Sequence, residues 1–217
     1  METDFRYERK FRVEAHEATF AEVLAAIRQL PVLFRPAYPD RLVSSLYLDT
    51  ADWQAFRANA AGLAERAKPR LRWYGAATAP TGARLEIKRR HGLVGTKELL
   101  PLPGGLPAPG AARGGAAWAT YAATHSWLRH YPELRPTAVV SYRRSYLASA
   151  DGRLRLTLDR ELRYGLPGAA PSALLPDGAT IIELKYPVGT PPDCLPTLPF
   201  RLTRNSKYVS AVVRLWG

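Results

Sequence analysis

Charged side chains occupy alternate positions in several strand-like segments of this chain. Side chains two residues apart on a β-strand point to the same face of the sheet. Mostly basic residues, with a few acidic ones, alternate in this way at Arg6, Glu8, Lys10 and Arg12, at Arg70 and Arg72, at Arg84, Glu86, Lys88 and Arg90, at Arg153, Arg155 and Asp159, and at Glu183 and Lys185. The positions between them are mainly apolar or aromatic. The pattern predicts strands that pack on one face and present the other to a strongly anionic ligand, with glutamates that can hold a divalent metal.

The overall charge agrees with an anionic partner. The chain of 217 residues contains 31 Lys and Arg against 19 Asp and Glu, a formal net charge of +12. This charge favours nucleic acid, phosphate polymers, nucleotides or acidic membrane without choosing among them. Many of the basic residues are arginines in strands, and arginine is the better bidentate partner for phosphate. The composition therefore favours phosphate recognition.

Other features indicate one soluble domain in a reducing compartment. Hydrophobic residues make up 47% of the chain, enough for a core, and the length fits a single domain over residues 1–217. The one cysteine, Cys194, excludes an intramolecular disulfide. The N-terminus lacks the apolar stretch of a signal peptide, and no apolar run approaches the ~18 residues that span a bilayer. We expect a cytoplasmic protein with no membrane segment, and leave open whether a membrane partner exists.

Periodicity places the expected elements along the chain. Alternation predicts strands at 4–14, 43–50, 67–75, 83–91, 96–100, 137–148, 153–164 and 179–186. Helical spacing of apolar residues predicts helices at 17–30, 52–59, 117–130 and 206–215. The Asp151-Gly152 pair predicts a hairpin, and the segments 101–115 and 165–178 are rich in Pro and Gly, which predicts loops.

The basic rows have an ordinary explanation and a functional one. Many alternating strands are half-buried and simply show a polar face to solvent. Like charges directly opposite each other on neighbouring strands are destabilising, however, so a wall of arginines persists more readily when a polyanion neutralises it. The economical arrangement is an α+β fold in which a closed antiparallel barrel points its cationic residues inward. The helices at 17–30, 117–130 and 206–215 would then cover its apolar exterior.

An ordered set of short motifs resembles a known family. The motifs are residues 6–11 (RYERKF), 45–49 (SLYLD), 70–75 (RLRWYG), 86–88 (EIK), 142–144 (YRR), 155–159 (RLTLD), 183–185 (ELK) and 206–208 (SKY). Together they resemble the catalytic domain of the vacuolar transporter chaperone (VTC) polyphosphate polymerases. That domain belongs to the triphosphate tunnel metalloenzymes, also called the CYTH superfamily. The resemblance extends from about residue 4 to 213.

The resemblance implies a fold, an activity and a set of site residues. Members of the superfamily form an eight-stranded antiparallel tunnel that binds triphosphate or polyphosphate with a divalent metal. By motif position, the phosphate-binding residues would be Lys10, Arg70, Arg72, Lys88, Tyr142, Arg144, Arg155, Arg204, Ser206 and Lys207. Of these, catalysis would fall to Arg70, Arg72, Lys88, Arg144, Arg155 and Lys207. The metal, Mn²⁺ or Mg²⁺, would bind chiefly to Glu183, with Glu8 and Glu86 as further candidates. These glutamates have the alternative role of counter-charges for the basic rows. For Asp159 we expect a structural role, either pairing with an arginine or capping a turn at Arg160.

Two positions depart from the superfamily pattern. The usual N-terminal Glu-x-Glu-x-Lys appears as Arg6-x-Glu8-x-Lys10, which is similar to the polymerase branch. Arg90 stands where polymerases can carry histidine. The regulatory and membrane segments that accompany eukaryotic relatives are absent from the 217 residues.

The expected function is transfer of the terminal phosphoryl group of ATP to a growing polyphosphate chain. The expected partners are therefore ATP and inorganic polyphosphate or triphosphate. One alternative is a tripolyphosphatase or nucleoside triphosphatase with the same fold. Another is a non-catalytic module that binds polyphosphate or another polyanion. Nucleic acid is not expected, because nucleic-acid readers usually place aromatic side chains on the basic face, whereas here the aromatics mostly alternate away from the charges.

Overall fold

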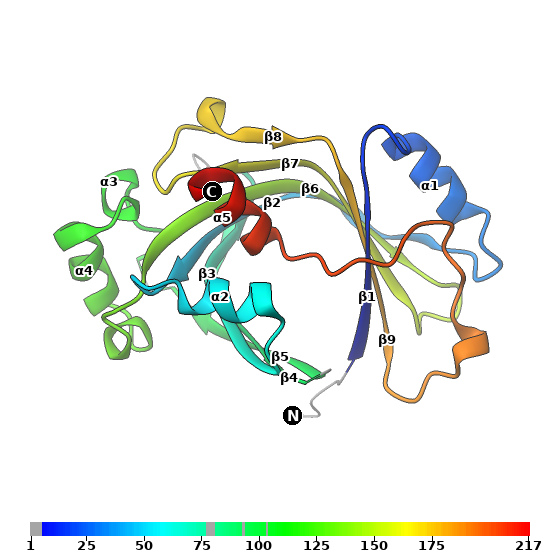
Figure 1. Ribbon diagram of the computed structural model, residues 1–217, viewed down its shortest axis with the longest axis horizontal. Helices are drawn as coiled ribbons and strands as arrows, with labels where there is room; N and C mark the ends of the chain where they lie inside the picture. Colours follow the sequence, from blue (N-terminus) through cyan, green and yellow to red (C-terminus); the bar gives the residue numbers. More distant parts are fainter. Residues whose placement is uncertain (1–5, 77–80, 93, 103) are drawn as a thin grey trace. The chain divides into compact units, whose positions relative to one another are not determined.

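The computed structural model describes residues 6–76, 81–92, 94–102 and 104–217, and Figure 1 shows its ribbon. The strands are β1 (Arg6–Val13), β2 (Arg35–Asp49), β3 (Glu65–Tyr74), β4 (Thr81–His91), β5 (Val94–Pro101), β6 (Arg135–Ala148), β7 (Arg155–Gly165), β8 (Leu175–Asp177) and β9 (Thr180–Pro187). The α-helices are α1 (Phe20–Arg28), α2 (Gln54–Ala61), α3 (Pro109–Ala112), α4 (Gly115–Ala123) and α5 (Lys207–Trp216). Short 3-10 turns are η1 (Leu128–His130), η2 (Pro171–Ala173) and η3 (Pro192–Cys194). The expected α+β class is confirmed.

Eight of the strands form one hydrogen-bonded path. Their order is β1-β9-β7-β6-β2-β3-β4-β5, with β8 beside β7. The pairings of β1 with β9, β7 with β9, β2 with β3, β3 with β4 and β4 with β5 are antiparallel. The expected eight-stranded antiparallel sheet is therefore present. The sequence predicted a closed barrel, but within the described ranges the path ends at β1 and β5 and is not closed by hydrogen bonds.

The edge of β1 has a local partner, which explains why the path ends there. A bridge joins Phe11 to Leu202, and the backbone N–H of Thr203 donates to the carbonyl of Lys10 at 2.8 Å. The segment 201–205 thus covers backbone groups that another strand would otherwise pair with.

The chain forms two compact units, each built from three separated segments. Unit 1 comprises Met1–Arg41, Tyr142–Leu162 and Asp177–Asn205. Unit 2 comprises Leu42–Ser141, Arg163–Pro176 and Ser206–Gly217. Each unit has its own apolar core. The single domain over 1–217 stays a prediction.

In unit 1, helix α1 covers the apolar face of the strands. The helix begins with a capping box, in which the Glu22 N–H donates to Thr19 Oγ1 at 3.3 Å and the Thr19 N–H donates to Glu22 Oε2 at 2.7 Å. Its buried residues Val23 and Ile27 join one cluster with strand residues. The strand members include Phe11, Val13, Leu156, Leu158, Ile182 and Leu184. These are the positions between the charges, so the packed face was predicted correctly here.

In unit 2, α4 and η1 cover the apolar face of the strands. Trp118 and Ala122 of α4 and Leu128 of η1 share a cluster with strand residues. The members from β3 and β4 are Leu71, Trp73, Leu85 and Ile87. The Trp118 indole N–H donates to the carbonyl of Leu134 at 2.7 Å, which satisfies the one polar group of this buried ring. Figure 1 shows α3 beside α4.

Helix α5 lies on the polar face of β2 and not on the apolar face that the sequence analysis expected it to cover. The Tyr208 ring stacks on Tyr47 with centroids 5.0 Å apart, and Tyr208 Oη donates to Asp49 at 2.5 Å. Tyr47 and Asp49 alternate along β2 with Leu46 and Leu48, which belong to the apolar cluster. The stacked rings and the hydrogen bond to a buried carboxylate hold the first turn of the helix on this face.

The Asp151-Gly152 hairpin between β6 and β7 is confirmed. The Gly152 N–H donates to the carbonyl of Ser149 at 2.8 Å, and Gly152 has a φ of 71°. This left-handed conformation favours glycine. The Asp151 side chain accepts the N–H of Arg153 at 3.1 Å, which fixes the turn further.

Most other expected elements are present within a few residues of their predicted limits. Residues 4 and 5 of the expected first strand lie outside the described ranges. Strand β2 begins at Arg35 rather than 43, and its early part contains Pro36 and Pro39. The pairing of β2 with β3 begins only at Val43, so these prolines remove no hydrogen bond to β3. Strand β8 and helix α3 are short elements inside the segments expected to be loops.

We expect Leu158→Ala to destabilise the protein by about 2–5 kcal/mol, because it opens a cavity in a fully buried part of the unit 1 core. Chemical denaturation measures the free energy of unfolding. The control is Leu202→Ala, since Leu202 is 59% exposed in the same unit. Equal losses for the two variants would contradict this core.

Candidate functional site

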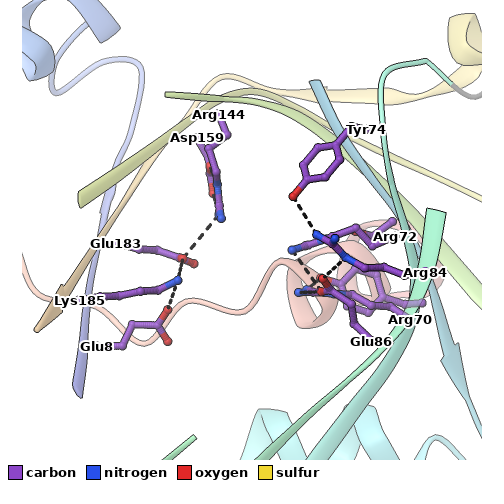
Figure 2. Close-up of polar contacts among 12 residues, drawn as sticks. Glu8, Arg70, Arg72, Tyr74, Arg84, Glu86, Arg144, Asp159, Glu183 and Lys185 are labelled. Carbon is purple, nitrogen blue, oxygen red and sulfur yellow. Dashed lines mark hydrogen bonds and ion pairs between the residues drawn. The ribbon is translucent and has the colours of Figure 1, made fainter. Parts of the chain in front are cut away.

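Three arginines of unit 2 surround one buried glutamate. Glu86 of β4 is 1% exposed and lies opposite Arg70 of β3. Arg70 donates from Nε and Nη2 to Glu86 Oε2 at 3.0 and 2.7 Å. Arg72 Nη1 lies 3.4 Å from the same oxygen, and Arg84 Nε donates to Oε1 at 3.1 Å. Figure 2 shows the three guanidinium groups pointing toward Glu86. We name Arg70, Arg72, Arg84 and Glu86 the arginine clamp, in which positive charge exceeds negative charge.

The arginine clamp keeps its carboxylate ionised. Burial by itself would raise the pKa of Glu86, but the charges of Arg72 and Arg70 and the hydrogen bond from Arg70 lower it to about 2. Burial also opposes the charge of Arg84, whose pKa is nevertheless raised by Tyr74 and Glu86. Tyr74 Oη accepts from Arg84 Nη2 at 2.9 Å. The guanidinium groups are thus fixed in orientation while their positive charge remains in excess, as an anion site requires.

Lys88 lies in a row of three lysines. The strand register places Lys68 of β3 opposite Lys88, and Lys88 opposite Lys97 of β5. Burial lowers the pKa of Lys97. The charge of Glu86 opposes this shift, and the charges of the three clamp arginines add to it. Like charges directly opposite one another are destabilising. The row therefore adds to the field that favours a polyanion on this face of unit 2.

Ser206 and Lys207 lie at the start of α5, also in unit 2. Ser206 is the N-cap of the helix, and its hydroxyl oxygen accepts from the Val209 N–H and from Lys68 Nζ, each at 3.4 Å. Lys207 is 8% exposed. The charge of Lys207, together with those of Arg70 and Arg72, acts on the Tyr47 hydroxyl. The structure thus groups Lys207 with the arginine clamp around one phenol.

Unit 1 holds a cluster in which both signs of charge are present. Lys10 Nζ lies 3.6 Å from Glu8 and 3.4 Å from Glu183, and Lys185 Nζ lies 3.9 and 3.8 Å from the same two carboxylates. The register explains the contacts, since Glu8 is opposite Lys185 and Lys10 is opposite Glu183. Figure 2 shows Lys185 between Glu8 and Glu183.

Arg144 connects this cluster to Asp159. Its Nε and Nη2 donate to the two carboxylate oxygens of Asp159 at 2.5 and 2.7 Å, and Nη2 lies 3.5 Å from Glu183. Burial opposes the charge of Arg144, but Asp159, Tyr142 and Glu183 raise its pKa. The guanidinium carbon lies 5.2 Å from the centre of the Tyr142 ring. Of the two structural roles expected for Asp159, pairing with an arginine is confirmed. Tyr142 lies against one of the predicted phosphate-binding arginines.

Arg155 and Arg204 are more peripheral than the other predicted residues. Both side chains are exposed. Arg155 begins β7 and is opposite Lys185 of β9, while Arg204 lies in the segment beside β1. Their roles in phosphate binding stay predictions.

The three candidate metal ligands differ in surroundings. Glu86 is engaged by the arginine clamp, which is the geometry of a counter-charge. Glu8 and Glu183 lie together in unit 1, each beside Lys10 and Lys185. Across the part of the chain that the structure describes, no three His, Cys, Asp or Glu side chains are grouped to hold a metal ion. A hard cation here would need oxygen ligands from a bound phosphate as well.

Sequence reasoning missed several residues that contact the predicted set. Lys68 alternates with Arg70 and Arg72, so its place on the same face was readable from the sequence. Lys97 required the register of β5 against β4. Ser45 and Tyr47, which accept hydrogen bonds from Arg72 and Arg70, lie in the motif SLYLD but carry no charge. Neutral hydroxyl groups gave no signal of their own.

Comparison with protein families identifies the chain. The model of the VTC domain matches residues 5–215. The chain therefore belongs to the VTC domain family.

Solved structures with a similar backbone have low sequence identity. One is a putative adenylate cyclase from Vibrio parahaemolyticus, with 12% identity, 87% of this chain and 79% of that chain covered, and a TM-score of 0.48. A second is a putative adenylyl cyclase from Hippeastrum described as having a dominant triphosphatase activity, with 16% identity, coverage of 87% and 81%, and a TM-score of 0.41. A third is in the Mediator head module of Schizosaccharomyces pombe, with 9% identity, coverage of 87% and 85%, and a TM-score of 0.46. At these TM-scores the likenesses support no statement about activity.

No curated protein sequence was found to be similar to the chain. None of the helices in the described ranges combines the length and the hydrophobicity that crossing a bilayer demands.

We expect acid to weaken the protein through Glu86. A carboxyl group whose pKa is lower in the folded state than in the unfolded state stabilises the fold at any pH above its unfolded-state pKa. That stabilisation is lost as the pH falls from the unfolded-state pKa to the folded-state pKa. For Glu86 the loss extends from about pH 4.5 down to about 2, and a shift of this size corresponds to roughly 3 kcal/mol. Chemical denaturation between pH 7 and pH 2.5 should show Glu86→Gln less stable at neutral pH, with the difference shrinking in acid. A constant difference over this range would contradict the ion-pair assignment.

Proposed function

We propose that this VTC domain is an ATP-dependent polyphosphate polymerase. The observation that carries the proposal is the arginine clamp, in which three fixed guanidinium groups share one buried carboxylate. Lysines and the N-terminus of α5 add further positive charge in the same unit. Guanidinium groups form geometrically defined hydrogen bonds to phosphate oxygens. Membership of the VTC family supports a triphosphate or polyphosphate as the anion.

The chemistry requires positioning and charge neutralisation more than proton transfer. A terminal oxygen of polyphosphate attacks the γ-phosphorus of ATP, and the bond from that phosphorus to the β,γ-bridging oxygen breaks. ADP leaves with the electron pair, and the acceptor chain is longer by one phosphate. The acceptor oxygen is already ionised at neutral pH, so no general base is needed. Catalysis of such a transfer rests on in-line placement and on stabilisation of charge at the transferring group.

In this proposal the arginine clamp and Lys88 hold the donor phosphates. Because Arg70 and Arg72 are oriented before substrate arrives, little reorganisation accompanies the reaction. Within unit 1, Lys10, Tyr142, Arg144 and Arg155 would contribute to phosphate binding. Ser206 and Lys207 would contribute from the start of α5, and Arg204 from the preceding segment.

The carboxylates of unit 1 fit a divalent metal that also binds phosphate. Mg²⁺ and Mn²⁺ take oxygen ligands, and Mg²⁺ commonly uses one or two carboxylates with substrate phosphates. Glu183 and Glu8 would supply the protein ligands, while Lys10 and Lys185 would leave these carboxylates to contact phosphate. When bound, such a cation neutralises charge on the phosphate oxygens. Glu86 would remain the counter-charge of the arginine clamp.

The proposed location is the cytoplasm. Cys194 is a free and exposed thiol, which suits a reducing compartment. ATP is the proposed donor, and inorganic polyphosphate or triphosphate the acceptor and product.

We expect Arg72→Ala to lower the rate of ATP-dependent polymer synthesis about 10²–10³-fold, as loss of one charge-stabilising donor does at other sites. Gel electrophoresis of the products made from ATP and Mn²⁺ measures chain synthesis. The control is Arg89→Ala. Arg89 follows Lys88 in β4, so its side chain points to the other face of the sheet. Full synthesis by Arg72→Ala would contradict the proposed site. Release of orthophosphate by the unaltered chain would instead identify a hydrolase, and polyphosphate binding without turnover would identify a binding module.

Metal dependence is a separate test. We expect EDTA to abolish synthesis and added Mn²⁺ or Mg²⁺ to restore it. Glu183→Gln should raise the metal concentration for half-maximal rate by at least about tenfold. Loss of a residue that only hydrogen-bonds a metal ligand already weakens metal binding by about this factor. The control is Glu161→Gln, which alters another arginine-paired glutamate of unit 1. An unchanged metal requirement in Glu183→Gln would remove this residue from the metal site.

A further inference from the structure

Three polar side chains of β2 share the face that carries the arginine clamp. Ser45, Tyr47 and Asp49 are 1%, 3% and 0% exposed. They alternate with Leu46 and Leu48, which pack in the apolar core. Polar groups at this depth need hydrogen-bond partners. Their partners include Arg72 and Arg70 of the arginine clamp and Tyr208 of α5.

Arg70 and Arg72 of β3 each contact acceptors on both neighbouring strands, β2 and β4. The register places Ser45 opposite Arg72 and Tyr47 opposite Arg70. Arg72 Nε donates to Ser45 Oγ at 3.1 Å, and Arg70 Nη1 donates to Tyr47 Oη at 3.0 Å. Glu86 binds the same two guanidinium groups from β4. A planar donor group with acceptors on two neighbouring strands has little freedom to rotate.

Tyr47 also connects the arginine clamp to α5. Its ring stacks on Tyr208 with an interplanar angle of 19°, and Tyr208 donates to Asp49. Asp49 in turn accepts the N–H groups of Thr50, Ala55 and Phe56 at 2.8 Å each. Asp49 therefore fixes both the start of α2 and the first turn of α5.

The charges around Tyr47 agree with this arrangement. Burial by itself would raise the pKa of Tyr47, but Arg70 and Arg72 lower it by their charges, the hydrogen bond from Arg70 lowers it, and Lys207 lowers it further. The phenol oxygen is therefore an acceptor surrounded by cations of the candidate site. Burial and the acceptor Asp49 raise the pKa of Tyr208, which keeps that hydroxyl a donor.

We propose that Tyr47 is a positioning residue that orients Arg70 for phosphate, and that Ser45 has the same role for Arg72. The inference deepens the proposed function, because it concerns the same site. The phenol does not touch the reacting atoms. It acts by holding a guanidinium group in the orientation that phosphate binding uses.

Tyr47→Phe tests this assignment, since phenylalanine keeps the ring that stacks on Tyr208 and removes only the acceptor. Affinity for inorganic tripolyphosphate, measured by calorimetry without ATP, should fall about tenfold, the effect of one hydrogen bond to a charged group. The matched control is Tyr121→Phe. It removes a 2.8 Å hydrogen bond from Tyr121 Oη to the Gly105 carbonyl in the same unit, away from the arginine clamp. Its affinity should equal that of the unaltered chain.

A double-mutant cycle separates positioning from general stability. In an Arg70→Ala background, Tyr47→Phe should cause no further loss of affinity, because the group that it orients is gone. The proposal would be overturned if Tyr47→Phe lowered the affinity tenfold in the Arg70→Ala variant as well. It would also be overturned if Tyr47→Phe caused no loss of affinity in the chain that keeps Arg70. Ser45→Ala with Arg72→Ala gives a second, independent cycle. Binding is read without turnover, so the result stands whether or not the chain synthesises polyphosphate.

Discussion

The pairing of one buried carboxylate with three guanidinium groups organises unit 2. Arginine side chains on adjacent strands repel one another, and Glu86 makes their proximity stable. A single negative charge leaves the group cationic, however. The same arrangement thus satisfies two demands that usually conflict, since the strands pair stably and the face still attracts an anion.

The charged faces of the two units differ in chemistry. In unit 2 the cations outnumber their counter-charge, which suits phosphate. In unit 1, Glu8, Glu183 and Asp159 balance Lys10, Lys185 and Arg144, and the carboxylates offer oxygen ligands. The face of unit 2 therefore suits an anion, and the face of unit 1 offers the oxygen ligands that a hard cation takes. Each face follows from the alternation of residues within its own strands.

Sequence patterns predicted which face of a strand is packed better than they predicted which side chains contact one another. The alternation of Arg70 and Arg72 with Leu71 and Trp73 was enough to assign the packed side of β3. The role of Glu86 depended on the register between β3 and β4, which no local pattern encodes. Helix α5 was assigned to the wrong face because its location depends on contact between Tyr208 and Asp49, and the early part of β2 was missed because its prolines are typical of loops.

The link between Asp49 and Tyr208 joins residues 159 positions apart in the sequence. During synthesis on the ribosome, β2 emerges long before the helix that completes its polar face. Until then the Asp49 carboxylate lacks its phenol donor, and the Tyr47 ring lacks the ring that stacks on it. Contacts of such long sequence separation carry a loop-closure cost that slows folding. A nascent chain can therefore complete the polar face of β2 only after Tyr208 has been translated.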